Sequence, residues 1–149
     1  MDEVEKFRSD ILKSVKFGLV YVLDQTKEPI RLFNHEIKSL KQEVGNLLFN
    51  TELDHLDSSS KSFENYLETL SDIKLVSYNS SDEEKNRTSS YLQDLSEVSG
   101  LMNLADSEDE EVYEMLMSRL PRAYNLYETI KEHVTDVLEV LESVAYINS

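Results

Sequence analysis

Residues 108–146 read EDEEVYEMLMSRLPRAYNLYETIKEHVTDVLEVLESVAY, and this stretch decides the fold. Its apolar residues recur at intervals that alternate between three and four, which is the pattern of a long α-helix packed against other helices. Pro121 cannot donate a backbone hydrogen bond to the carbonyl of Met117, so we expect a kink or a break there. The predicted inward-facing residues are Tyr113, Leu116, Leu120, Ala123, Tyr127, Ile130, Val134, Val137, Leu141 and Val144.

The composition agrees with an all-α fold. The chain has 149 residues, a length typical of one domain, and 40% of them are apolar, which is enough to build a core. Only 3 glycines and 2 prolines are present, too few for the tight turns of a many-stranded sheet. We therefore predict an antiparallel bundle of four to five helices that forms a single domain over residues 1–149.

Four further amphipathic segments precede the C-terminal helix. The stretch 25–29 is expected to connect the first two helices, with Pro29 in the first turn of the second. The polar stretch 50–60 is expected to be a loop or a short helix. Near the C-terminal helix, Ser107 is predicted to cap the first turn together with Glu110. The four segments predicted to be helical cover residues 2–24, 30–47, 61–76 and a range that starts at 82.

The first helix has two possible roles for its apolar end. The run Phe17–Leu23 is too short to span a bilayer and too apolar for an ordinary surface helix. It is expected either to lie in the middle of the bundle or to form part of a self-association surface. The predicted inward face of this helix is Val4, Phe7, Ile11, Val15, Gly18 and Val22, widened by Leu12 and Leu19.

Charge is distributed unevenly along the chain. The formal net charge is −15, yet residues 1–50 carry eight basic and eight acidic side chains, so residues 51–149 hold the whole excess. A surface this acidic repels nucleic acid and anionic lipid, so we expect neither direct nucleic-acid binding nor membrane binding. A charged partner of this chain is expected to be a basic protein surface.

Two acidic groups are the candidate partner-binding residues. In the second of these groups, Glu128, Glu132 and Asp136 are spaced by four residues on one helix. Carboxylates at this spacing repel each other, so this group needs a cation that offsets the repulsion. That cation comes either from the basic face of the predicted helix over residues 30–47 or from a partner, and the sequence leaves both open. The first group is Glu108, Asp109, Glu110, Glu111 and Glu114, and the second is Glu128, Glu132 and Asp136.

Signatures of catalysis are missing from the sequence. There is no cysteine, which excludes disulfides, thiol nucleophiles and Cys-ligated zinc, and the three histidines lie on different segments. The group Glu52, Asp54, His55 and Asp57 is either a divalent-cation site or a solvated acidic loop, and we expect the loop. We predict no enzymatic activity, no cofactor and no metal. No secretory signal or membrane span is visible, so a cytoplasmic location is expected.

Two stretches carry a resemblance to a known family. HEIKSLKQEV at residues 35–44 and VTDVL at residues 134–138 resemble segments in the N-terminal helical domains of plant intracellular immune receptors. The acidic EDVID-type motif of those domains is not found here. The resemblance implies a signalling domain that associates with itself, for example as a homodimer. This is the alternative of two expected functions. The charge pattern favours an acidic adaptor or inhibitor that binds a basic surface, and this is the first expectation.

Overall fold

The computed structural model describes residues 2–44, 49–79, 82–106 and 108–149. These residues are helical almost throughout and include no strand, so the prediction of an all-α bundle with a long C-terminal helix is confirmed. The elements are α1 (Glu3–Val44), α2 (Asn50–Ser71), the 3₁₀ turn η1 (Leu75–Ser77), α3 (Asp82–Leu95), α4 (Glu97–Ala105) and α5 (Glu110–Asn148).

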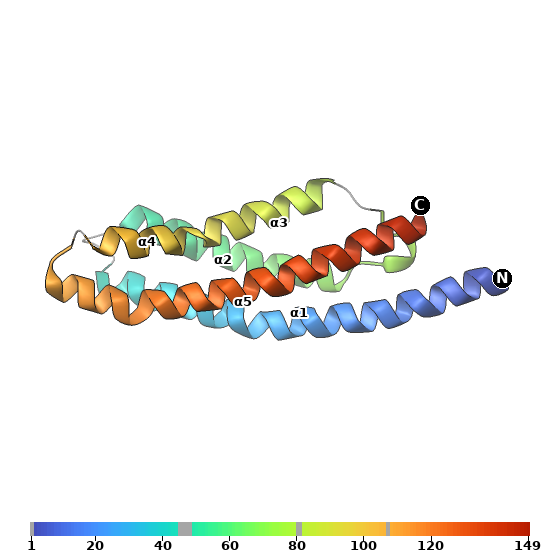
Figure 1. Cartoon of the computed structure of the whole chain (residues 1–149), viewed down its shortest axis with the longest axis horizontal. Coiled ribbons are helices and arrows are strands. Elements are labelled where there is room, and N and C mark those ends of the chain that lie inside the picture. The colour runs from blue at the N-terminus through green and yellow to red at the C-terminus, as the bar shows by residue number, and fades with distance from the viewer. Residues whose placement is uncertain (1, 45–48, 80–81, 107) are drawn as a thin grey trace.

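The bundle is long and narrow (Figure 1). The helices α1 and α5 lie side by side in opposite directions along most of its length, and they form its most extensive contact. The helix α2 packs along α1, and α4 packs on the first part of α5. At the end where α5 finishes, the first turns of α1 extend beyond it. The core is therefore a continuous seam between the two longest helices, covered by the shorter ones.

The predicted inward face of α5 is confirmed except at its first position. Tyr113 is exposed in the opening turns, and the nine apolar residues that follow it in the predicted series are buried. The helix continues through Pro121 without a break. A proline inside a helix costs about 3 kcal/mol. Leu120 and Ala123 are buried on either side of it, and burial along the rest of the face offsets that cost.

The predicted connection at residues 25–29 is wrong, because α1 is a single helix that includes Pro29. Thr26, within the expected connection, is fully buried in the core, and its Oγ1 donates a 2.8 Å hydrogen bond to the carbonyl of Val22. The three- and four-residue spacing of buried positions therefore runs unbroken through this region. Residues 45–47 of the predicted second helix lie outside the described residues.

The predicted inward face of the first half of α1 is also wrong. Leu12 and Leu19, expected only to widen that face, are buried together with Leu23. Gly18 and the first three predicted positions are exposed, and Val15 and Val22 are half-buried. The run Phe17–Leu23 is divided between the two expected roles, because its leucines are buried in the bundle while Phe17 and Tyr21 face outward. Two apolar series with the same spacing compete in this sequence, and the one containing the leucines continues into the rest of α1.

The expected loop over residues 50–60 is helical and forms the first half of α2. Ser60 occupies a fully buried position between Leu56 and Phe63, and its hydroxyl donates a 3.1 Å hydrogen bond to the carbonyl of Asp57. A serine can enter a helix core when its own backbone satisfies the hydroxyl in this way. The polar run of serines therefore hides an apolar face that α1 covers.

Two further boundaries differ from the prediction. The fourth predicted helix is divided at Ser96 into α3 and α4. Ser107, the predicted cap of α5, lies outside the described residues. The N-cap of α5 is Asp109, whose side chain accepts a 2.9 Å hydrogen bond from the backbone N–H of Val112. A carboxylate in this position also interacts favourably with the positive end of the helix dipole.

Replacing Leu141 or Ile37 with alanine tests the seam. Both side chains are buried, so each substitution should lower the free energy of unfolding by about 2–5 kcal/mol through lost burial and a residual cavity. Urea titration followed by circular dichroism measures this change. Ser143→Ala, at an exposed position of α5, is the control and should change stability by less than about 0.5 kcal/mol. If Leu141→Ala and Ile37→Ala unfold like the parent, the seam assignment is wrong.

Candidate functional site

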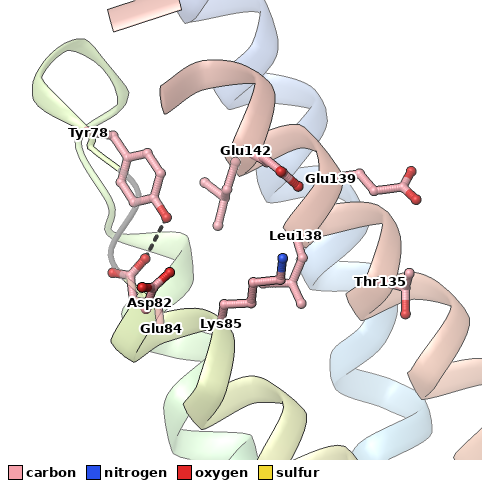
Figure 2. Close-up of a pocket in the computed structure, with 9 residues that line it drawn as sticks. Tyr78, Asp82, Glu84, Lys85, Thr135, Leu138, Glu139 and Glu142 are labelled. Atoms are coloured by element: carbon pink, nitrogen blue, oxygen red, sulfur yellow. Dashed lines mark hydrogen bonds between the residues drawn. The ribbon is translucent and has the colours of Figure 1, made fainter. Parts of the chain in front are cut away.

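An acidic groove lies between the start of α3 and the last third of α5 (Figure 2). Its volume is about 280 Å³. Figure 2 shows Glu139 and Glu142 projecting from α5, and Glu84 and Lys85 projecting from α3 on the other side. The lining residues are Tyr78, Asp82, Glu84, Lys85, Thr135, Leu138, Glu139, Leu141 and Glu142.

The lining combines negative charge with an apolar floor. Four carboxylates and one ammonium group surround the groove, so its formal charge is strongly negative. Leu138 and Leu141 supply the apolar part, and Leu141 belongs to the buried seam of α5. Lysine and arginine side chains combine an aliphatic stem with a charged head, and such a lining suits both parts. The groove therefore places negative charge beside an apolar surface.

One wall of the groove is held by Tyr78. Its hydroxyl donates a 2.6 Å hydrogen bond to Oε2 of Glu84, and burial, together with this carboxylate, raises the pKa of Tyr78 well above its usual range. The backbone carbonyl of Tyr78 accepts a 2.7 Å hydrogen bond from Nδ2 of Asn148 at the end of α5. The same amide donates at 2.7 Å to the carbonyl of Leu75 in η1. The hydroxyl of Tyr78 therefore stays protonated and donates its hydrogen bond to α3, while the backbone carbonyl of Tyr78 is hydrogen-bonded to α5.

The groove continues along α5 in both directions. Towards the start of the helix it meets a shallow hollow of about 400 Å³, which shares Thr135 with it. Towards the end of the helix it meets another of about 460 Å³, which shares Glu139 and Glu142. The first hollow contains the predicted acidic stripe Glu128, Glu132 and Asp136, together with Lys131. The predicted stripe therefore lies beside the acidic groove on the same helix, and Thr135 lines both.

Three basic residues of α1 pair with other carboxylates rather than with this stripe. Lys27 lies 3.2 Å from Asp24 and 3.1 Å from Glu68, and Arg31 lies 2.6 Å from Glu28. These contacts raise the pKa values of Lys27 and Arg31, the largest cause being the hydrogen bond to Glu68 and to Glu28 respectively. Within the described ranges, the structure records no ion pair to any of the three stripe carboxylates. The sequence left open whether the basic residues of this helix neutralise the stripe, and the described residues show no such pairing.

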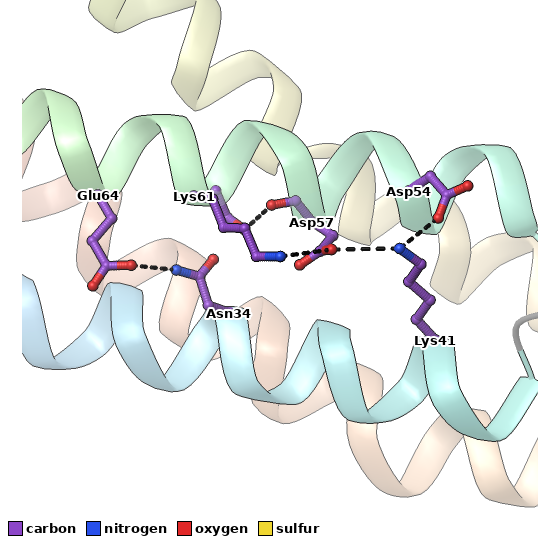
Figure 3. Close-up of polar contacts among 7 residues, drawn as sticks. Asn34, Lys41, Asp54, Asp57, Lys61 and Glu64 are labelled. Atoms are coloured by element: carbon purple, nitrogen blue, oxygen red, sulfur yellow. Dashed lines mark hydrogen bonds and ion pairs between the residues drawn. The ribbon is translucent and has the colours of Figure 1, made fainter.

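Lys41, the remaining paired lysine of α1, binds α2 (Figure 3). Its Nζ lies 2.7 Å from Asp54 and 3.5 Å from Asp57. Asp57 is buried and also contacts Lys61 at 3.3 Å, while its Oδ1 has no hydrogen-bond partner. The possible divalent-cation site at residues 52–57 is thus divided, because its two aspartates, Asp54 and Asp57, pair with lysines on this side of α2. His55 contacts different residues.

The acidic cluster at the start of α5 is separate from the groove. Glu114 and Glu128 are fourteen residues apart, which corresponds to about 21 Å along a helix. Arg119 and Arg122 lie between them, and these arginines pair with Glu43 and, at 3.4 Å, with Glu36 of α1. The eight predicted partner-binding residues therefore fall into two patches. One is the exposed first turns of α5, and the other is the stripe that joins the groove.

His55, Asp94 and Glu97 form the one group among the described residues that has the donors for a metal ion. They come from α2, α3 and α4, and their ligand atoms lie within 4.8 Å of one another. Nδ1 of His55 is 3.0 Å from Oε2 of Glu97, and Nε2 is 4.0 Å from Oδ1 of Asp94. The hydrogen bond to Glu97 raises the pKa of His55, so its proton competes with any cation for the imidazole. All three side chains are at least partly exposed.

Comparisons with known proteins found no relative, so the proposed function rests on the geometry of the site. No family model, no curated protein and no solved structure matches the chain. Over the described residues, none of the helices combines the length and apolar character needed to cross a membrane. Sequence reasoning missed the α3 side of the groove, including Tyr78. The acidic first turn of α3 was visible, but only the bundle topology places it beside residues 135–142 of α5.

The raised pKa of His55 predicts a pH-dependent contribution to stability. Its protonated form is stabilised in the folded state, so the contribution is present below the unfolded pKa of 6.5 and is lost as the pH rises through the folded pKa. His55→Gln should therefore lower the melting temperature more at about pH 6 than at about pH 9. His35→Gln, which removes an exposed imidazole from α1, is the control. An equal effect of His55→Gln at both pH values would contradict the ion pair.

Proposed function

We propose that this chain is a non-enzymatic protein-binding module whose acidic groove binds a basic segment of a partner protein. The observation that carries the proposal is the groove itself, in which four carboxylates and one lysine surround an apolar floor. The absence of recorded ion pairs to the adjoining stripe, among the described residues, supports the same function. Carboxylates that form no ion pair within the described part of the chain are available to an external cation.

The proposed contact uses both parts of a basic side chain. The aliphatic stem of an arginine or lysine packs on Leu138 and Leu141, and its charged head binds Glu139 or Glu142. Arginine fits best, because its planar guanidinium forms two parallel hydrogen bonds to one carboxylate. Beyond the groove, Tyr146 and Ile147 expose apolar surface next to the same carboxylates. The partner segment is therefore basic with interspersed apolar residues.

The cluster at the start of α5 acts at longer range in this proposal. Glu110 and Glu111 are exposed in the first turn, where they contribute to the field around the protein without lining the groove. Complementary charges raise association rates by about ten- to a thousandfold at low salt. The cluster steers a basic partner towards the chain, and the groove then binds it. A cytoplasmic adaptor or inhibitor is the class of protein that fits this division of roles.

Neutralising the groove carboxylates tests where binding occurs. The double substitution Glu139→Gln with Glu142→Gln should weaken binding to a synthetic peptide of alternating arginine and leucine by at least about tenfold, measured by fluorescence anisotropy. The matched control is Glu52→Gln with Glu68→Gln, which removes the same charge from exposed positions of α2 outside both the groove and the cluster. If both pairs weaken binding equally, affinity follows net charge alone and the groove is not the site.

Neutralising the cluster tests the steering role. The substitutions Glu108→Gln, Asp109→Asn, Glu110→Gln and Glu111→Gln should slow association with the same peptide and reduce the dependence of that rate on salt. Dissociation should stay close to that of the parent, and stopped-flow fluorescence separates the two rates. The melting temperature should fall only slightly, because asparagine also caps helices well. An unchanged association rate would contradict the steering role.

A further inference from the structure

The first half of α1 carries an apolar stripe that no described helix covers. The exposed fraction is 76% for Val4, 68% for Phe7, 39% for Ile11 and 65% for Tyr21. Large apolar side chains exposed together on one helix are unusual in a monomeric protein and indicate an interaction site. The first turns of α1 also extend beyond the end of α5, so the stripe begins where the bundle offers it no neighbour (Figure 1).

The stripe has the geometry of a second helix-packing seam. Ser14 and Gly18 complete the spacing between Ile11 and Tyr21, so the positions alternate between three and four residues apart as they do in the core. Both small residues are exposed, and a Cβ added at Gly18 would meet no atom within 4 Å. The surface is therefore open enough for another helix to approach the backbone closely. The stripe positions are Val4, Phe7, Ile11, Ser14, Gly18 and Tyr21.

The charge distribution indicates what covers this stripe. The chain has a net charge of −15, so two copies repel each other over most of their surfaces. The first 50 residues are the exception, because they carry eight acidic and eight basic side chains, and the stripe lies on a part of them, residues 2–24, with five acidic and four basic side chains. A second copy of the chain meets the least repulsion and the largest apolar gain at this face. A strongly basic partner is instead attracted to the acidic surface of α5.

We propose that this stripe is the interface of a parallel homodimer in which the two α1 helices pack side by side. In a parallel pair, the residue before Val4, Ile11 or Gly18 on one helix faces the residue that follows the next stripe position on the other helix. Glu3 of each copy then pairs with Arg8 of the other. By the same rule, the exposed Phe17 lies against Val22 of the second copy.

The flanking charges select the parallel orientation over the antiparallel one. An antiparallel pair brings the same flank of both helices together. The flank formed by the residues that precede Val4 and Ile11, and that continues on the same side of the helix, carries Glu3, Asp10 and Asp24. An antiparallel pair would therefore bring the acids of one copy against the acids of the other. The parallel pair avoids this repulsion and gains two ion pairs at the exposed end of the helices. The large side chains of both copies bury on the order of 1,000 Å², which is near the lower limit for a specific interface. An interface of this size belongs with weak protein–protein contacts, so we expect a dissociation constant on the order of micromolar.

Sedimentation equilibrium tests whether the stripe is the interface. The parent should be mainly dimeric at about 50 µM, and Phe7→Glu should raise the dissociation constant by at least about tenfold. Val76→Glu is the matched control, because Val76 is exposed on η1 in a hollow that none of the stripe residues lines, and it should leave the dimer intact. Circular dichroism should show both variants folded, since neither position belongs to the core. A monomeric parent, or a Phe7→Glu variant that dimerises like the parent, would overturn the proposal.

Cross-linking tests the orientation. The chain has no cysteine, so a single Ile11→Cys substitution introduces the only thiol. In a parallel dimer the two copies of this position face each other at a separation that a disulfide can span, so mild oxidation should give a covalent dimer. Val76→Cys at the same concentration is the control and should remain monomeric on a non-reducing gel. Failure of Ile11→Cys to cross-link under conditions where the parent is dimeric would overturn the parallel arrangement. Both experiments use the chain alone, so their results are independent of the acidic groove.

Discussion

The structure depends on burial of one apolar seam between α1 and α5. Each helix contributes a face whose buried positions are spaced by three and four residues, and the faces remain in contact over most of both helices. Each helix also contains a proline, Pro29 in α1 and Pro121 in α5. A short isolated helix would end at such a residue. Here the burial on both sides of each proline outweighs the lost hydrogen bond, so a tertiary interaction decides the local structure.

The sequence predicted α5 well and α1 poorly, and the two helices differ in one respect. In α5 a single apolar series exists, and its spacing identifies the buried face directly. In α1 two series with the same spacing run side by side, one through Leu12 and Leu19 and the other through Phe7 and Ile11. Spacing alone cannot rank them. The first is buried because it continues past Thr26 into the second half of the helix, and this required recognising threonine as a core residue.

The candidate site shows the same limit in another form. The stripe Glu128, Glu132 and Asp136 could be predicted because its members lie on one helix at a constant spacing. The groove could not, since Tyr78 and Glu84 are brought beside Glu139 only by the path of the chain. The sequence also gave no reason to expect His55 beside Glu97, which is 42 residues away. Sites within one helix are readable from sequence, whereas sites between helices need the topology.

The long separation between the two sides of the core has a consequence for the nascent chain. During synthesis α1 emerges first, but its main partner α5 is complete only about a hundred residues later. Until then α1 exposes both of its apolar series to water, and α2 can cover only part of one. Contacts between distant segments also slow folding, because a long loop must close before they form. The emerging chain is therefore most prone to aggregation before α5 has been synthesised, and α1 is the region that a chaperone would need to shield.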